Sequence, residues 1–284
     1  MKVLVFGTTG QVARALADRA GQEDEIIALS RAEADLSDPD ACAAIIAASQ
    51  VQTVINAAAW TAVDAAEDHE AEAHVINAEA PGAMARACAA RDIPFVHIST
   101  DYVFDGTGDA PWRPESPTAP LGAYGRTKLA GEHLVAASGA SHAILRTSWV
   151  FDAEGRNFLT TMLRLSETRD HLRVVADQVG GPTPAAAIAE ACLTIAKALA
   201  AGQGASGTYH FAGTPDVSWA DFARAIFAAA GRDVTVEDIP ASEYPTPSAR
   251  PANSRLDCTS LMETFGIARP DWRQAVAAHV KVAS

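Results

Sequence analysis

The chain has 284 residues, of which 49% are hydrophobic and 20% charged, a composition that excludes a disordered protein and allows a large buried core. Its formal net charge of −13 excludes non-specific nucleic-acid binding, because no surplus of cations can replace the counterions of the phosphates. A local site for an anionic small ligand is compatible with this charge.

The cysteines and the N-terminus indicate the compartment. The four cysteines (Cys42, Cys88, Cys192 and Cys258) are far apart and form no C-x-x-C or metal-ligand cluster, so we expect them to be reduced. Met1 and Lys2 precede a short apolar run that ends in glycine, which is typical neither of a signal peptide nor of a membrane span. We therefore expect a cytoplasmic protein without a membrane partner.

The first half of the sequence alternates short apolar runs with alanine-rich helical segments. The pattern predicts strands at residues 3–6, 25–29, 51–55, 94–99 and 143–149 and helices at 12–20, 39–48, 71–91 and 122–136. Asp38 and Pro39 are a typical N-cap and first helical residue. Strands that alternate with helices in this way indicate βαβ units and a parallel sheet with helices on both faces.

The second half is less regular. It predicts another sheet strand at 172–176, a helix at 185–201, a turn at 202–207, a strand at 209–212, a helix from Ser218 to 229, a proline-rich loop at 240–251 and a final helix at 272–282. The predicted fold is α/β, a Rossmann-type doubly wound parallel sheet with a smaller C-terminal α/β substrate lobe. Residues 1–145 plus about 172–203 are assigned to the nucleotide-binding domain, and about 146–171 plus 204–284 to the lobe.

A glycine-rich turn, GTTGQVA at residues 7–13, lies between the first strand and the first helix. Gly7 and Gly10 permit torsions that other residues avoid and let a pyrophosphate approach the main chain. Ala13 takes a third position at which close helix–strand packing needs a small side chain. In this strand–turn–helix context, the G-x-x-G-x-x-A pattern predicts binding of a nicotinamide dinucleotide.

The end of the second strand indicates which dinucleotide binds. An acidic residue there favours NAD, whereas a cation favours the 2′-phosphate of NADP. The sequence reads Leu29-Ser30-Arg31 and has no carboxylate at the strand end, so we predict NADPH, with NADH as a second accepted cofactor. The alternative for Arg31 is an ordinary solvated surface charge.

Tyr124 and Lys128 are spaced so that they share one face of a helix. A free phenol has a pKa of about 10, and a nearby cation lowers that pKa toward neutrality. Ser99 and Thr100 end the fourth predicted strand, at the carboxyl edge where ligands of open α/β sheets bind. By itself, a Y-x-x-x-K pattern is most often an exposed pair of residues on a helix. Here it follows the glycine turn and then a strand that ends in two hydroxyl side chains, and this order of motifs favours a carbonyl reductase.

These motifs resemble the extended short-chain dehydrogenase/reductases, and the resemblance covers essentially the whole chain. It is carried most specifically by STDYVFDG at 99–106, YGRTKLAGE at 124–132, RTSWVF at 146–151, DQVGGPT at 177–183 and RPANSRLD at 250–257. The segments are most similar to members that reduce C4 of a 4-keto-6-deoxyhexose carried on dTDP. Such a protein would have a dTDP-linked keto-sugar substrate and serve synthesis of a cell-surface polysaccharide.

The resemblance also implies site residues. Tyr124 would protonate the developing alkoxide, Lys128 would lower the pKa of Tyr124, and Thr100 would polarise the carbonyl. The resemblance implies the cofactor-binding residues Gly10, Gln11, Val12, Asp35, Leu36, Ala58, Ala59, Thr61, Tyr124 and Lys128. The patterns described above add Gly7 and Arg31 to this set. The implied substrate-binding residues are Val63, Thr100, Asp101, Tyr102, Trp149, Asn157, Gln178, Arg250 and Asn253.

Two departures from the family limit what the resemblance implies. Some members dimerise through a magnesium ion held partly by a glutamate on the first helix, but here this helix begins Val12-Ala13-Arg14-Ala15-Leu16. We therefore expect no metal site, and a monomer or a homodimer without a metal bridge. Trp60 stands where a smaller polar or imidazole side chain is common.

Two other functions stay open. One is reduction of a different nucleotide-linked 4-keto-6-deoxy sugar. The other is a non-catalytic regulatory subunit that keeps the fold and binds NADP. The intact Thr100, Tyr124 and Lys128 argue against the second, because a binding module does not need an acid and a matching cation.

Overall fold

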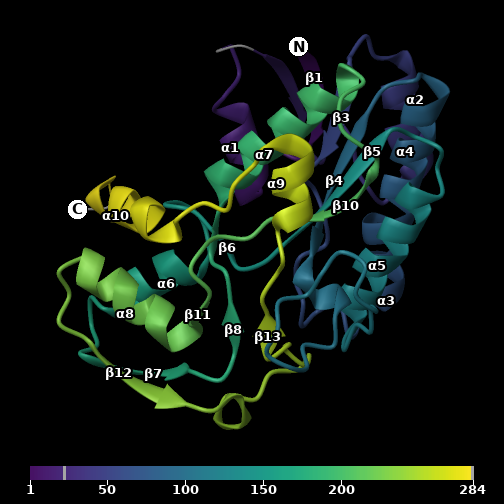
Figure 1. The fold of residues 1–284 in the computed structure, drawn as a ribbon. Coiled ribbons are helices and arrows are strands. Elements are labelled where there is room, and N and C mark those ends of the chain that lie inside the picture. The colour runs from purple at the N-terminus through teal and green to yellow at the C-terminus, as the bar shows by residue number, and fades with distance from the viewer. Residues whose placement is uncertain (22–23, 283–284) are drawn as a thin grey trace.

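The structure is a computed structural model that describes residues 1–21 and 24–282. A six-stranded parallel sheet with the order β10-β5-β4-β3-β1-β2 forms its larger part (Figure 1). The strands are β1 (Lys2–Phe6), β2 (Glu25–Leu29), β3 (Thr53–Asn56), β4 (Phe95–Thr100), β5 (His142–Thr147) and β10 (Gly207–His210). All their carboxyl ends lie at one edge, because every pairing in this sheet is parallel.

Helices cover both faces of this sheet. On one face pack α1 (Gln11–Ala17), α7 (Ala185–Ala200) and α9 (Thr259–Phe265), and on the other α2 (Pro39–Ala48), α4 (Ala80–Ala90) and α5 (Ala123–Ala136). Successive residues of β1 point to opposite faces, so Val3 and Val5 enter one core and Leu4 and Phe6 the other. The predicted doubly wound α/β fold is confirmed.

Local signals at the helix ends are also confirmed. The Asp38 side chain accepts a hydrogen bond from the Ala41 N–H and so caps α2. The Ser218 side chain does the same for α8 (Trp219–Ala229) through the Asp221 N–H. These bonds satisfy N–H groups that have no partner within the helix itself.

The single helix predicted at 71–91 contains a π-helical turn. It runs as α3 (Glu70–His74), the π turn Val75–Glu79 and then α4. The turn carries the buried Asn77, whose Oδ1 accepts from Trp60 N at 2.8 Å and whose Nδ2 donates to Thr127 Oγ1 at 3.1 Å. The π turn thus joins the loop after β3 to α5, and such turns often occur at functional sites.

Within residues 1–21 and 24–282, the smaller lobe consists of three short sheets and three helices, which lie beside the main sheet (Figure 1). Its strands are β6 (Val150–Phe151) with β9 (Thr183–Pro184), β7 (His171–Val175) with β12 (Thr235–Ile239), and β8 (Val179–Gly180) between β11 (Val217–Ser218) and β13 (Asn253–Ser254). Its helices are α6 (Phe158–Leu165), α8 and α10 (Trp272–Val282), which share one apolar core.

One predicted placement is wrong. The strand predicted at 172–176 exists as β7, but it pairs with β12, which was not predicted, and does not join the six-stranded sheet. Its inward residues Leu172 and Val174 belong to the core of the lobe. The sixth place in the main sheet is taken by β10, whose Tyr209 packs into the core beneath α7.

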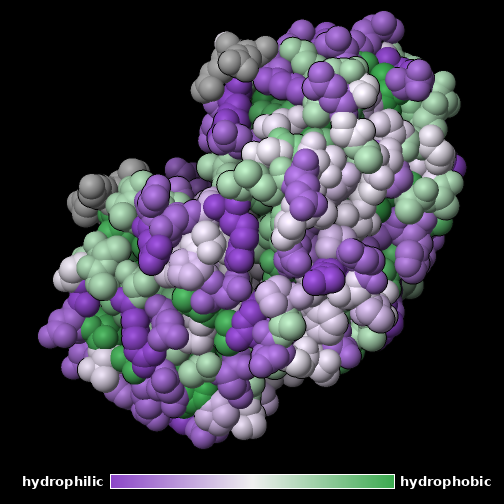
Figure 2. Space-filling model, in the orientation of Figure 1, coloured by the Kyte–Doolittle hydropathy of each residue, from purple (hydrophilic) through white to green (hydrophobic). Residues whose placement is uncertain are grey.

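Hydrophilic side chains are spread over both parts of the molecule, whose outline is indented where they meet (Figure 2). None of the helices in the described parts of the chain combines the length and the apolar character needed to cross a membrane.

Candidate active site

A cavity of about 500 Å³ opens at the carboxyl ends of β1 and β2. Gly7 has φ +112°, a backbone conformation that residues with a side chain rarely adopt, so the turn needs glycine. The predicted cofactor residues that line this cavity are Gly7, Gly10, Arg31, Asp35, Leu36, Ala58, Ala59 and Thr61. A glycine turn and small alanines leave the backbone open to the adenosine half of a dinucleotide.

Arg31 lies at the rim of this cavity. Its side chain is 80% exposed, and its Nε lies 3.3 Å from Asp35 Oδ2. A hydrogen bond from the Ser37 backbone lowers the pKa of Asp35, so this carboxylate keeps its charge beside the guanidinium. The rim therefore presents a cation and an anion together, rather than the lone cation that the sequence indicates.

A second cavity, of about 560 Å³, shares the lining residues Gly10 and Ala57–Ala59 with the first and continues along the sheet edge. It brings together most of the remaining predicted residues: Gln11, Val12, Val63, Thr100, Asp101, Tyr102, Tyr124, Lys128 and Trp149. In the described parts of the chain, three buried oxygens of this lining have no hydrogen-bond partner: Gln11 Oε1, Asp101 Oδ2 and Thr147 Oγ1. Unpaired buried polar atoms are costly, so this cavity is suited to a polar ligand.

Tyr124 enters this cavity from the first turn of α5. Burial raises the pKa of Tyr124 to about 12; a hydrogen bond with the Thr100 hydroxyl opposes this shift and the nearby Asp101 adds to it. The predicted lowering of the Tyr124 pKa by Lys128 is not found. With a raised pKa, the phenol keeps its proton at neutral pH and can act as a proton donor.

Lys128 lies one helical turn further along α5 and is 2% exposed. Its Nζ donates a hydrogen bond to the Ile98 carbonyl at 2.7 Å and lies 3.3 Å from His97 Nε2. Burial lowers the pKa of Lys128 to about 8. The amino group is therefore held against β4, where it does not compensate the Tyr124 phenol.

Thr100 and Asp101 form a small polar wall where β4 ends. Thr100 Oγ1 donates to Asp101 Oδ1 at 3.1 Å and accepts from Tyr102 N at 3.2 Å. Burial raises the pKa of Asp101 to about 6, against hydrogen bonds from Ser254 and Thr100 that lower it. This wall faces the Tyr124 hydroxyl, so a carbonyl oxygen placed between them would meet two hydroxyl groups.

A third cavity, of about 750 Å³, lies in the lobe and has aromatic walls. Tyr102 and Trp149 line both this cavity and the second one. Trp149 has φ +50°, a strained backbone conformation for a bulky residue, and its indole stacks on Trp219 with ring centroids 3.5 Å apart. Gln178 and Arg250, two of the predicted substrate-binding residues, line the third cavity.

Arg250 lines the third cavity together with Tyr102, which also lines the second. Its Nη2 donates to Asp64 Oδ1 at 2.8 Å, and its guanidinium lies 6.0 Å from the centre of the Tyr102 ring. Its buried Nη1 has no hydrogen-bond partner among the described residues. A guanidinium with an unused donor suits a diphosphate.

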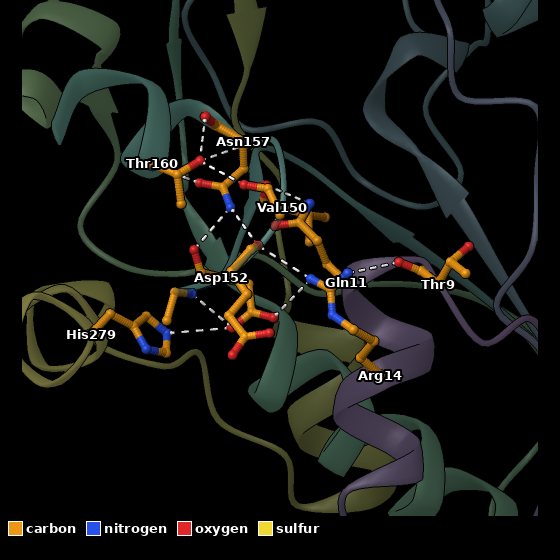
Figure 3. A network of polar contacts seen from close by, with 11 residues as sticks. Thr9, Gln11, Arg14, Val150, Asp152, Asn157, Thr160 and His279 are labelled. Carbon is orange, nitrogen blue, oxygen red and sulfur yellow. Dashed lines mark hydrogen bonds and ion pairs between the residues drawn. The ribbon is translucent and has the colours of Figure 1, made fainter. Parts of the chain in front are cut away.

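Two predicted substrate residues lie outside the cavities described above. The Asn157 amide caps α6 by accepting from Thr160 N at 3.1 Å and donates to the Asp152 carbonyl at 2.8 Å (Figure 3). The Asn253 amide donates to the Ala110 carbonyl at 2.8 Å and accepts from Arg255 N at 3.2 Å. Their hydrogen-bonding groups hold backbone segments, and the structure does not bring them into the site.

Arg14 has a role that the sequence did not indicate. Its guanidinium donates to the Thr9 carbonyl at 2.7 Å and to the Glu154 carbonyl at 3.2 Å, and it lies 3.5 Å from Asp152 Oδ2 (Figure 3). Gln11 adds a bond of 3.4 Å from its Nε2 to the Val150 carbonyl. Both side chains tie the glycine turn to the first loop of the lobe, and no local pattern could reveal so distant a contact.

A doubly wound parallel sheet with a glycine turn and a buried tyrosine–lysine pair defines a nicotinamide-dependent reductase of the extended short-chain type. The comparison with protein families agrees. Residues 1–284 match the family described as RmlD substrate binding domain, and the chain belongs to this family.

Known proteins resemble the chain over nearly its full length. It is 46% identical to a dTDP-4-dehydrorhamnose reductase of Burkholderia thailandensis, over 99% of this chain and 98% of that protein, and 44% identical to one of Sinorhizobium fredii, over 97% and 95%. A solved dTDP-4-dehydrorhamnose reductase of Clostridium acetobutylicum has TM-score 0.93 at 35% identity, covering 100% and 99% of the two chains. One of Bacillus anthracis, in complex with NADP, has TM-score 0.91 at 30% identity, with 100% and 99% covered.

Proposed function

We propose that the protein reduces the C4 keto group of dTDP-4-dehydro-6-deoxy-L-mannose to give dTDP-L-rhamnose, with NADPH as the reductant. The observation that carries this proposal is the second cavity, in which the glycine-turn residues meet Thr100, Tyr124 and Lys128. Membership of the family and the names of its full-length relatives support the sugar substrate. The bound NADP of the Bacillus anthracis protein supports the cofactor.

We assign roles to the residues from their positions and from the resemblance to the family. NADPH, when bound along the first two cavities, supplies the hydride. Thr100 hydrogen-bonds the carbonyl oxygen, and Tyr124 donates its proton to the oxygen as negative charge develops there. Lys128 would leave the Ile98 carbonyl to hold the nicotinamide ribose, and it would then compensate the phenolate that Tyr124 becomes.

The substrate is assigned to the second and third cavities. Val63, Asp101, Tyr102 and Trp149 line the sugar position, and Gln178 and Arg250 the nucleotide and its diphosphate. The unpaired Asp101 Oδ2 and Arg250 Nη1 support these assignments, because a hydroxyl-rich sugar and a diphosphate supply their missing partners. We do not extend the assignment to Asn157 and Asn253, whose amides are bound to the backbone.

We propose two functional units, a cofactor unit around the six-stranded sheet, including α7 and β10, and a sugar-nucleotide lobe that includes β7 and β12. We further propose a cytoplasmic protein that acts as a monomer or as a homodimer without a metal bridge. The basis for the last point is α1, which has no acidic residue in its first turn, whereas some members of the family carry a metal-binding glutamate on this helix.

The proposed reaction is tested by following NADPH absorbance with purified protein and a panel of nucleotide-linked keto sugars. We expect oxidation of NADPH with dTDP-4-keto-6-deoxy-L-mannose and formation of dTDP-L-rhamnose. Turnover of a different nucleotide-linked keto sugar alone would instead establish another reductase of this type. Tight NADPH binding without turnover of any sugar would contradict the enzyme and favour a regulatory subunit.

The cofactor preference is tested at Arg31. Because a guanidinium hydrogen bond to a phosphate contributes about 1 kcal/mol at an exposed site, Arg31→Ala should weaken NADPH binding roughly fivefold and leave NADH binding unchanged. Dissociation constants of both cofactors from fluorescence titration measure this difference. Arg113→Ala, which removes another exposed arginine beside an aspartate, is the matched control. Equal loss for both cofactors would show that Arg31 does not recognise the 2′-phosphate.

A further inference from the structure

A buried histidine lies directly beneath the proposed catalytic lysine. His97 is on β4 and 1% exposed, and its Nε2 lies 3.3 Å from Lys128 Nζ. Its ring stacks on Phe95 with the planes 14° apart. The proposed reaction assigns no role to this imidazole. The imidazole nevertheless contacts Lys128, which the proposed function places on the nicotinamide ribose when the cofactor binds.

Asn56 determines which nitrogen of His97 carries the proton. Asn56 Oδ1 accepts a hydrogen bond from Ala58 N at 3.1 Å, so its amide nitrogen faces His97 Nδ1, at 3.3 Å, and donates to it. Burial lowers the pKa of His97 well below its usual value, and the ring is therefore neutral. A neutral imidazole has one donor and one acceptor, so the hydrogen is on Nε2.

This tautomer points an N–H group at Lys128. An ammonium group has only donors, so a charged Lys128 would place an N–H group against the His97 Nε2–H group, and no hydrogen bond could form between them. A neutral amine has a lone pair that accepts from Nε2–H while it donates to the Ile98 carbonyl at 2.7 Å. The hydrogen-bond arrangement therefore favours the neutral amine, and the burial of Lys128 acts in the same direction.

We propose that His97, through the tautomer imposed by Asn56, favours the neutral amine of Lys128 in the free protein, so that at alkaline pH NADPH binding is coupled to uptake of one proton. Cofactor binding draws Lys128 Nζ from His97 to the ribose hydroxyls, and the amine takes a proton from solvent to become the ammonium group. This inference rests on the proposed function, which requires a charged Lys128 beside Tyr124. His97 is thus a positioning residue that acts through Lys128.

Other titratable groups lie near Lys128. Glu132 lies one turn further along α5 and favours the charged lysine, but its own charge is matched by Arg146 on β5 at 2.6 Å. On the cavity side, the pKa of Asp101 is about 6 and that of Tyr124 about 12. A proton taken up between pH 7 and 9.5 therefore reports on Lys128 rather than on these neighbours.

The coupling is tested by NADPH binding without substrate. Because the neutral amine must gain a proton, wild-type affinity should be constant below pH 8 and fall about tenfold per pH unit above it. Calorimetry in two buffers with different ionisation heats should show about one proton taken up at pH 9. In His97→Gln, the amide can turn its oxygen toward the ammonium group. The pH at which NADPH binding begins to weaken should then be higher than in the wild type. The NADPH affinity of this variant at pH 9 should stay near its value at pH 7.

Controls separate this effect from a general change in the fold. His210 is another fully buried, neutral histidine of the same sheet, and His210→Gln should leave the onset of weakening where wild type has it. In Asn56→Asp, the carboxylate accepts a hydrogen bond from His97 Nδ1–H, so the hydrogen is no longer on Nε2 and Nε2 can accept from the ammonium group of Lys128. This variant should therefore move the pH at which NADPH binding begins to weaken upward, as His97→Gln does. Constant wild-type affinity up to pH 9.5, or an unchanged onset in both His97→Gln and Asn56→Asp, would overturn the inference. Absence of NADPH binding at pH 7 would contradict the proposed function instead.

Discussion

Tyr124→Phe is expected to lower kcat by about 10² to 10⁴-fold and to change NADPH affinity by less than about twofold. The substitution removes the one phenol hydroxyl that meets Thr100 in the second cavity, while it keeps the ring and its packing on Tyr102. Without a proton donor, negative charge at the carbonyl oxygen is stabilised by Thr100 alone. Stopped-flow measurement of single-turnover hydride transfer, together with NADPH titration, distinguishes this loss from a loss of binding.

A buried tyrosine outside the site provides the control for Tyr124→Phe. The Tyr209 hydroxyl donates to the Ala205 carbonyl at 2.7 Å, away from the cavities, so Tyr209→Phe should keep kcat within about twofold of wild type. The high pKa of Tyr124 adds a second expectation. Because this phenol is protonated below about pH 12 in the free protein, ultraviolet titration of the free protein should show no ionisation of Tyr124 between pH 6 and 9. Full turnover by Tyr124→Phe would rule out this residue as the acid.

Arg146→Met is expected to reduce the free energy of unfolding by about 3 to 5 kcal/mol. Arg146 and Glu132 are 5% and 3% exposed, and Arg146 Nη2 lies 2.6 Å from Glu132 Oε2. The Glu132 carboxylate also accepts from Ser99 Oγ at 2.5 Å, directly beside Thr100. Removing the guanidinium leaves this charge buried without its cation, and urea unfolding followed by circular dichroism measures the loss.

An exposed pair shows whether burial causes this loss. Arg126 makes two hydrogen bonds to Glu70, at 2.8 and 2.7 Å, but the two side chains are 45% and 44% exposed. Arg126→Met should therefore cost less than about 1 kcal/mol. A double variant with Arg146→Met and Glu132→Leu should recover much of the stability lost by the single change, because no unpaired charge remains. Equal losses for the two arginines would contradict this explanation.

The parts of the site that follow from local patterns could be predicted from the sequence. Gly7 needs its positive φ, and the spacing of Tyr124 and Lys128 on one helix needs no knowledge of the remainder of the fold. The carboxyl ends of parallel strands meet at one edge, which brought Thr100 to the same cavity as the glycine turn. These features depend on short stretches of chain, and the hydrophobic pattern is sufficient to order them.

Contacts between distant segments could not be predicted in this way. The apolar alternation of β7 is the same whether it joins the main sheet or pairs with β12, and only the complete fold selects the partner. The neutral state that we propose for Lys128 rests on His97 and Asn56, which lie on β4 and β3. Similarly, Asn157 matched a substrate position by sequence, but whether its amide points to a ligand or to the backbone depends on the local loop.

Tyr102 and Trp149, which line both the second and the third cavity, have a consequence for selectivity. A ligand made of two linked parts touches both sides of these aromatic rings, whereas a free sugar occupies one side only. Contacts far from the reacting carbon then help to hold it in place for reaction, and truncated ligands lose rate as well as affinity. With the substrate proposed above, the two rings would let the protein select a whole activated sugar over the same sugar free in solution.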